Sequence, residues 1–356
     1  AEGKYSLPVP AKRDASGSPV AGIAYTLRAD ASAFQTFPTA PRVALPIQVT
    51  APAQGVIQSA ATAITLLPLP ATSGMGTITG KVAIDSPAGT LVVAGNVTAL
   101  AATDGTFTIY NVPAGSVTVT AYRQGVNIDP VTLTLTAAAT AKDVTLAGNA
   151  KAAVSISGKV AIVNPGAGTD TSVILVVADT FVADAARGES PPGLRVTGVS
   201  GEFSFKGVPD GQYVVLAAFE NDHLVRDPDT CIGGTDVVKV TVAGSDVTLA
   251  ESFKITGALD VVSPDNEQVI SGVPSLIWVD DSSEDYYTVS VYDAFGSLVW
   301  QNPSVPSVNG GKNVSVAYAG PALVPGMFYQ YRASSIRKND CAISRTEDLR
   351  GVFQVQ

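Results

Sequence analysis

The sequence offers few side chains that could act together as acid, base or nucleophile. His223 is the single histidine among 356 residues, so a Ser–His–Asp site would have to use it. It lies in the stretch 220–224 (ENDHL), and no G-x-S-x-G turn, which would present a nucleophilic serine, occurs in the chain. Glycine motifs that bind phosphates or dinucleotides are also missing. We therefore expect no catalytic residues, and we expect His223 to be a loop or surface residue.

Two acidic clusters could bind a cation. The first surrounds a Gly-Gly turn and comprises Asp222, Asp227, Asp229 and Asp236. The second lies in one loop and comprises Asp280, Asp281, Glu284 and Asp285. Calcium prefers several oxygen ligands from such loops, although neither cluster has the spacing of an EF-hand loop. The sequence leaves two interpretations open, solvated acidic loops or calcium sites, and it predicts no other cofactor.

The two cysteines lie in separate turn-rich loops. Together with one histidine they lack the spacing of a zinc motif. In an exported chain, Cys231 and Cys341 have one obvious pairing, a disulfide that closes a long loop. We predict this bond between the third and fourth domains described below, provided that their loops meet.

Short strands with tight turns must position these residues. The segments 106–110 (TFTIY), 116–120 (SVTVT) and 131–135 (VTLTL) alternate apolar and polar residues, which is typical of half-buried strands. Between the first two lies N-V-P-A-G at 111–115, which predicts a β-hairpin. The chain is 46% apolar but only 7% aromatic and 15% charged. This composition favours an all-β fold made of thin sandwiches.

One motif occurs twice. The segment 104–115 (DGTFTIYNVPAG) recurs at 200–211 (SGEFSFKGVPDG), and 80–84 (GKVAI) recurs at 158–162. The two copies differ by insertions that fall in polar loops near 183–193 and 220–234. Strands that are kept while loops vary indicate one structural module used twice.

The repeated motif resembles the carboxypeptidase regulatory-like family, whose members are transthyretin-like seven-stranded sandwiches. The similarity rests on the G-x-V strand, the D-G-x-F segment with its V-P-x-G turn, and the alternating strand that follows. It covers roughly 75–150 and 153–252. The resemblance implies an architectural spacer or binding unit, and the family carries no catalytic residues to transfer.

The C-terminal hundred residues resemble a fibronectin type III domain. Trp278 lies on an early strand, and Tyr329 follows the corner sequence 323–326 (LVPG). The resemblance implies that Trp278 packs between two sheets and that Tyr329 ties the corner to nearby backbone.

The first 73 residues predict an incomplete module. Strands are expected near 24–30, 45–49 and 62–66, but the opening strand and the D-G-x-F segment are lacking. We therefore expect four domains at 1–73, 74–150, 151–253 and 254–356. The predicted fold class is all-β, with tandem immunoglobulin-like or transthyretin-like β-sandwiches in an elongated array.

Charge is unevenly spread along the chain. Residues 1–150 hold 8 Lys/Arg and 7 Asp/Glu, whereas residues 151–356 hold 14 and 24. The acidic half argues against nucleic acid or an anionic membrane surface as partner. No run of 18 apolar residues predicts a membrane span. Because the chain starts at Ala1, we expect an exported protein whose signal peptide was removed, located outside the cell or on its surface.

These observations predict a structural protein and not an enzyme. We expect a cell-surface or matrix component that self-associates into a filament or sheath through residues 1–73, because an incomplete sandwich leaves an unpaired sheet edge. The alternative is an adhesin that binds a surface glycan or protein through the loops 181–195 and 220–236 or through the last domain. A third reading is an accessory module of a secreted hydrolase.

Overall fold

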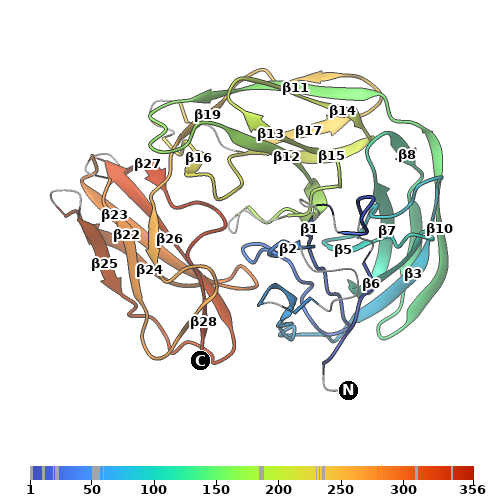
Figure 1. The fold of residues 1–356 in the computed structure, drawn as a ribbon, viewed down its shortest axis with the longest axis horizontal. Coiled ribbons are helices and arrows are strands. Elements are labelled where there is room, and N and C mark those ends of the chain that lie inside the picture. Colours follow the sequence, from blue (N-terminus) through green and yellow to red (C-terminus); the bar gives the residue numbers. More distant parts are fainter. Residues whose placement is uncertain are drawn as a thin grey trace.

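The regular secondary structure of the chain is almost entirely β-strand, as predicted. The structure, a computed structural model, describes residues 3–9, 13–18, 20, 24–49, 57–58, 60–183, 188–229, 231, 233–234, 237–281, 283–308, 312–337 and 340–356. Figure 1 shows three β-sandwiches that follow one another along an arc. The tandem sandwiches are thus present, and the array bends instead of running straight. In the described part of the chain, no helix has the length and apolar character needed to cross a membrane.

The first sandwich comprises residues 75–151 and has two four-stranded sheets. Their orders are β6-β3-β10-β8 and β5-β4-β7-β9. Apolar residues from alternate strand positions, among them Ile78, Phe107 and Val119, fill the space between the sheets. The strands are β3 (Met75–Ala83), β4 (Leu91–Ala94), β5 (Val97–Leu100), β6 (Thr106–Pro113), β7 (Gly115–Tyr122), β8 (Val126–Ile128), β9 (Val131–Leu135) and β10 (Thr140–Lys151).

The second sandwich comprises residues 154–257 and repeats this topology. Its sheets have the orders β14-β11-β19-β16, with β18 also paired to β11, and β13-β12-β15-β17. Both copies of the repeated motif therefore occupy equivalent strands. The elements are β11 (Val154–Ile162), β12 (Thr171–Val177), η2 (Ala178–Thr180), β13 (Arg195–Val199), β14 (Glu202–Val208), β15 (Gly211–Ala217), β16 (Leu224–Arg226), β17 (Val238–Val242), β18 (Val247–Thr248) and β19 (Phe253–Gly257).

The repeated motif pairs a glycine with a phenylalanine. Gly80 lies opposite Phe107, and Gly158 lies opposite Phe203, on neighbouring strands. A Cβ atom at either glycine would lie 2.7 Å from Cζ of its phenylalanine. The ring thus occupies the space that a side chain would fill, which explains why the two residue types occur together.

The hairpin predicted at this motif is wrong. β6 pairs with β3, whereas β7 pairs with β4 and β9 in the opposite sheet. The turn at 111–115, with Asn111 at φ 61° and Gly115 at φ 133°, carries the chain from one sheet to the other. Turn residues show where a chain bends but not which sheet its next strand joins.

The third sandwich comprises residues 261–355. Its sheets have the orders β20-β22-β25 and β21-β28-β26-β23-β24, with β27 also paired to β26. The strands are β20 (Val261–Ser263), β21 (Gln268–Ile270), β22 (Ser275–Val279), β23 (Tyr286–Asp293), β24 (Leu298–Pro306), β25 (Asn313–Ala317), β26 (Phe328–Arg337), β27 (Cys341–Arg345) and β28 (Val352–Val355).

Two residues of the third sandwich lie where the sequence placed them. Trp278 is fully buried between the sheets, with its ring centroid 5.4 Å from that of Tyr287. The hydroxyl oxygen of Tyr329 accepts a hydrogen bond of 2.9 Å from the backbone N–H of Val324. The tyrosine thus ties the corner to nearby backbone, as predicted.

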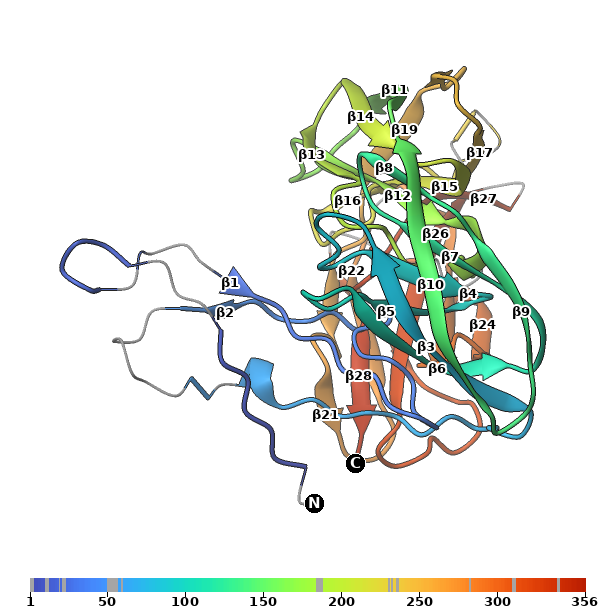
Figure 2. The same ribbon diagram turned by 90° about the vertical axis from the view of Figure 1, so that its right-hand side faces the viewer.

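The N-terminal segment differs from the incomplete sandwich that we expected. Its described residues form one two-stranded ladder, β1 (Ala24–Tyr25) with β2 (Ile47–Gln48), and one short helix, η1 (Ala60–Thr62). The strand expected at 62–66 is not formed. Residues 28–42 and 65–69, called the strap below, lie against the sandwiches, whereas the described residues within 3–25 and 43–62, called the arm, project away from them (Figure 2).

The strap connects the two ends of the arc. The side-chain amide of Asn111, in the first sandwich, forms hydrogen bonds with the strap backbone at Ala33 and Phe34. At the other end, Arg42 pairs with Glu267 of the third sandwich. The strap thus closes the arc by contacts to both of its ends.

Candidate functional site

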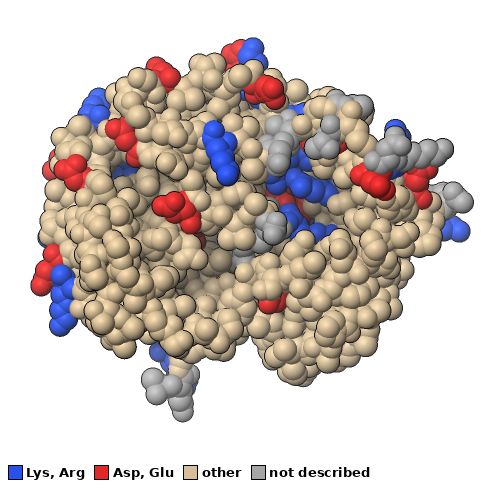
Figure 3. All heavy atoms as spheres, turned by 180° about the vertical axis from the view of Figure 1, so that it is seen from behind, with Lys and Arg blue, Asp and Glu red and all other residues tan. Residues whose placement is uncertain are grey.

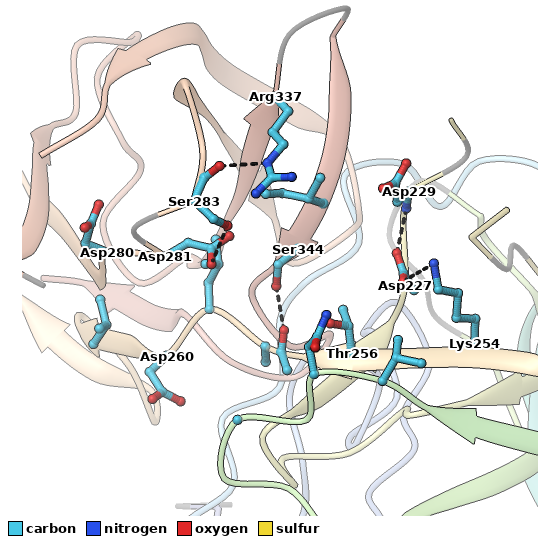
Figure 4. Close-up of a pocket in the computed structure, with 18 residues that line it drawn as sticks. Asp227, Asp229, Lys254, Thr256, Asp260, Asp280, Asp281, Ser283, Arg337 and Ser344 are labelled. Atoms are coloured by element: carbon cyan, nitrogen blue, oxygen red, sulfur yellow. Dashed lines mark hydrogen bonds and ion pairs between the residues drawn. The ribbon is translucent and has the colours of Figure 1, made fainter. Parts of the chain in front are cut away.

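The two acidic clusters of the sequence meet at one pocket between the second and third sandwiches. The pocket has a volume of about 600 Å³. Asp227 and Asp229 line it from the second sandwich, and Asp280 and Asp281 line it from the third (Figure 4). Asp260, in the connection between these sandwiches, also lines the pocket. Carboxylates far apart in the sequence therefore share one site.

Strand pairing places the first cluster. β16 runs antiparallel to β19, with Arg226 opposite Ile255, so that Asp227 follows opposite Lys254. The backbone N–H of Asp227 donates to the carbonyl of Lys254 at 2.8 Å, and Lys254 Nζ lies 2.9 Å from Asp227 Oδ2. Asp227 Oδ1 accepts the backbone N–H of Asp229 at 2.9 Å. The negative charge of the buried Asp227 is thus balanced by a lysine within the site.

A tyrosine orders the second cluster. The hydroxyl of Tyr287 donates to Asp280 Oδ1 at 2.8 Å and accepts the backbone N–H of Asp281 at 2.7 Å. Ser283 Oγ donates to Asp281 Oδ1 at 3.2 Å, and Arg337 Nε donates to the carbonyl of Ser283 at 2.8 Å. Figure 4 shows Asp280 on the far side of the site from Asp227 and Asp229. Asp227, Asp280 and Asp281 are therefore each held by a different partner, and the carboxylates of the pocket do not converge on one point.

Glu284 and Asp285 lie at the margin of the second cluster. Burial and the neighbouring Asp280 carboxylate raise the pKa of Glu284. The backbone N–H of Asp285 donates to the carbonyl of Ile336, and its side chain is exposed. Neither residue lines the pocket.

Asp222 belongs to a turn and not to the pocket. Its Oδ2 accepts a hydrogen bond of 2.6 Å from Thr171 Oγ1, and its Oδ1 accepts the backbone N–H of Leu224 at 3.1 Å. Asp236 lies outside the described residues. Among the residues that the structure does describe, one group of three possible metal ligands has its ligand atoms within 4.8 Å of one another, namely Asp229, Cys231 and Cys341. Two of these atoms are sulfurs bonded to each other. Calcium binding therefore stays a prediction.

A disulfide borders the site. Cys231 of the second sandwich and Cys341 of the third are joined, with a Cα–Cα distance of 6.2 Å across a sequence separation of 110 residues. Cys341 is buried. The bond connects the two sandwiches beside the pocket, so it limits how far they can separate.

His223 lies at the same junction, where its ring and its backbone N–H each face a carboxylate. Its Nδ1 lies 3.1 Å from Asp260 Oδ1, and its side chain is 56% exposed. The backbone N–H of His223 donates to Glu347 Oε1 at 2.7 Å. The histidine is a half-exposed loop residue of the second sandwich that contacts the third sandwich and the connection to it.

Sequence reasoning missed a buried ionic cluster beside this junction. Asp348 is fully buried and lies against Arg226 and Arg332. Burial alone would raise the pKa of Asp348, but Arg332, Arg226 and Arg345 outweigh it and hold that pKa below its usual range. Burial raises the pKa of the adjacent Glu347 to about 7. A run of polar residues after a strand gives no sign that it will be buried between domains.

Comparisons with known proteins identify no family. No protein-family model matches the chain. No curated protein matches it either.

Solved structures show only distant similarity. The TIE protein of Bacillus anthracis is 10% identical with a TM-score of 0.19; the match covers 80% of this chain and 48% of that one, so the chain spans about half its length. A minor pilin of Streptococcus agalactiae is 15% identical with a TM-score of 0.21, covering 54% of this chain and all of the other. The major pilin subunit of Bacillus cereus is 12% identical with a TM-score of 0.16, covering 76% and 92%. At these TM-scores the similarities support no inference about function.

Proposed function

We propose that this chain is a non-catalytic structural subunit of an extracellular or cell-surface assembly, and that subunits join through the N-terminal arm. The observation that carries the proposal is the projection of this arm from the sandwiches (Figure 2). It presents apolar side chains to solvent, with Tyr5 51%, Leu7 60% and Leu45 56% exposed. Exposed apolar segments of this kind are typical of interaction sites.

The rest of the molecule is suited to a load-bearing unit. The first two sandwiches share one hydrophobic cluster, in which Leu91 and Tyr122 pack with residues of the second sandwich. The rings of Tyr122 and Tyr213 meet edge to face at 5.8 Å. The disulfide connects the second and third sandwiches, and the strap connects the third to the first. An assembly of such units would transmit force through packed cores and covalent bonds.

Low surface charge also favours association. Residues 43–62 of the arm contain no charged side chain. Figure 3 shows charged side chains scattered over the back of the molecule between broad uncharged areas. Few charges leave little repulsion between copies. An arm that binds a different surface on the next copy makes a heterologous contact, which builds filaments unless the rotation closes a ring.

The proposal also includes the families of the three sandwiches and the export of the chain. The identical strand orders of the first two sandwiches support carboxypeptidase regulatory-like modules, and the Trp278 core with the Tyr329 corner supports a fibronectin type III-like domain. The disulfide supports export to an oxidising compartment, since such bonds persist there.

The experiment is a comparison of mass in solution. We expect light scattering of the intact chain to give a mass above that of one chain, rising with concentration. The double variant Tyr5→Asp/Leu7→Asp is expected to stay monomeric, because charge in an apolar contact is costly to bury. Val262→Asp, at an exposed apolar residue of the third sandwich, is the matched control and is expected to associate as the intact chain does.

A further inference from the structure

A second cavity lies inside the arc, where all four parts of the chain meet. Its volume is about 200 Å³. Three aromatic residues line it: Phe34 from the strap, Tyr110 from the first sandwich and Phe295 from the third. The second sandwich contributes Glu189. The cavity exists only because the strap closes the arc.

One asparagine fixes the part of the strap that carries Phe34. Asn111 Oδ1 accepts the backbone N–H of Ala33 at 2.7 Å, and Asn111 Nδ2 donates to the carbonyl oxygens of Ala31 and Phe34 at 3.1 and 2.9 Å. The pairing of β3 with β6 shifts register beside Tyr110 and Asn111, so a bulge presents both residues on the outer face of the sheet. One local irregularity thus brings both Tyr110 and the part of the strap that carries Phe34 to the cavity.

A glutamine fixes the third aromatic residue. Gln35 Nε2 donates to the carbonyl of Ala294 at 2.8 Å, next to Phe295 in the turn between β23 and β24. Gln35 itself lines the cavity, and an amide oxygen can accept hydrogen bonds. Asn96, in the turn between β4 and β5, lines the same cavity with an exposed amide.

Charge at the cavity is slightly negative. Arg28 forms an ion pair with Asp30 at 2.9 Å, donates to Thr98, and has its Nη1 3.7 Å from Glu189 Oε2. One guanidinium therefore faces two carboxylates. Burial raises the pKa of Glu189, with Arg28 opposing this effect. The cavity disfavours anions, whereas a neutral hydroxyl can donate to the Glu189 carboxylate.

We infer that this cavity binds one neutral sugar residue of a glycan. Aromatic rings pack against the C–H groups of a sugar ring, and amide and carboxylate groups hydrogen-bond its hydroxyls. The volume is below the roughly 300–1,000 Å³ of pockets for drug-sized ligands, which suits a single ring. A position between domains is also common for binding sites. This role is additional to assembly and does not depend on it.

The test uses the full chain and four probes, the methyl glycosides of glucose, galactose, mannose and N-acetylglucosamine, in calorimetric titrations. We expect saturable binding of at least one probe. Tyr110→Ala and Asn96→Ala should weaken it by roughly tenfold or more. Asn149→Ala, an exposed asparagine outside the cavity, is the matched control and should bind as the intact chain does.

Two outcomes would overturn the inference: no saturable binding of any probe, or an affinity in both cavity variants that equals the affinity of the intact chain. Asn96 is exposed in a turn, so its variant keeps the test valid if Tyr110→Ala fails to fold. Light scattering on the same variants separates this inference from the proposed assembly, because the cavity variants leave the arm intact.

Discussion

Arg42 of the strap pairs with Glu267 of the third sandwich, with 2.9 Å between Nε and Oε1. Its guanidinium carbon also lies 3.9 Å from the centre of the Phe328 ring. Arg42 is only 6% exposed, so one side chain combines an ion pair, a cation–π contact and a buried position. This contact closes the arc at its open end.

Replacement of Arg42 should therefore loosen the arc. We expect Arg42→Ala to lower the free energy of unfolding by about 1–2 kcal/mol, since it removes a partly buried pair and its ring contact. Lys159→Ala removes the exposed pair with Glu202 and should have no measurable effect. Urea unfolding measures both, and equal stability of the two variants would show that the strap does not hold the arc.

The glycine of the repeated motif offers a test of packing. A Cβ at Gly158 would lie 2.7 Å from Phe203 Cζ and 3.1 Å from Leu249 Cδ1. Gly158→Ala should lower the free energy of unfolding by about 1–3 kcal/mol through overpacking. Gly201→Ala, where nothing lies within 4 Å, should be neutral. Thermal unfolding measures the stability of both variants. Unchanged stability in Gly158→Ala would mean that Phe203 can move aside.

The disulfide can be tested directly. Mass spectrometry of the native protein should find no free thiol. Because the bond spans 110 residues, its loss in Cys231→Ser/Cys341→Ser should lower stability by up to about 4–5 kcal/mol in the chain-entropy model. Finding both thiols free in the native protein would contradict the pairing.

Stability should fall as the pH rises through the range set by Glu347. Burial raises its pKa from 4.5 to about 7 in the folded protein. Between these values the folded chain holds a proton that the unfolded chain releases, so the free energy of unfolding decreases with rising pH, by on the order of 3 kcal/mol in total. Glu347→Gln should remove this slope, whereas Glu202→Gln, at an exposed residue, should keep it. Unfolding at pH 4.5 to 8 gives the comparison, and an unchanged slope in Glu347→Gln would contradict the assignment.

The sequence predicted the elements whose signals are local. A few neighbouring residues suffice to indicate each of them: the alternating strands, the duplicated motif, the Trp278 core and the Tyr329 corner. It failed where the answer depends on distant partners. The turn at 111–115 joins two sheets, and residues 62–66 form no strand, because pairing partners decide both.

The sites could not be predicted without knowledge of how the domains are arranged. The acidic clusters were visible as sequence features, but their meeting at one pocket depends on how the second and third sandwiches pack. The cavity inside the arc draws Phe34, Tyr110, Glu189 and Phe295 from four separate parts of the chain. No spacing rule connects residues that only tertiary structure brings together.

The central claim is assembly through the arm. Sedimentation velocity of the purified intact chain, measured over a wide concentration range beside the variant that lacks residues 1–9, tests it most directly. We predict large species for the intact chain, seen as filaments in negative-stain micrographs, and a single monomeric species for the truncated chain. An intact chain that sediments as a monomer at the highest concentration would contradict the account.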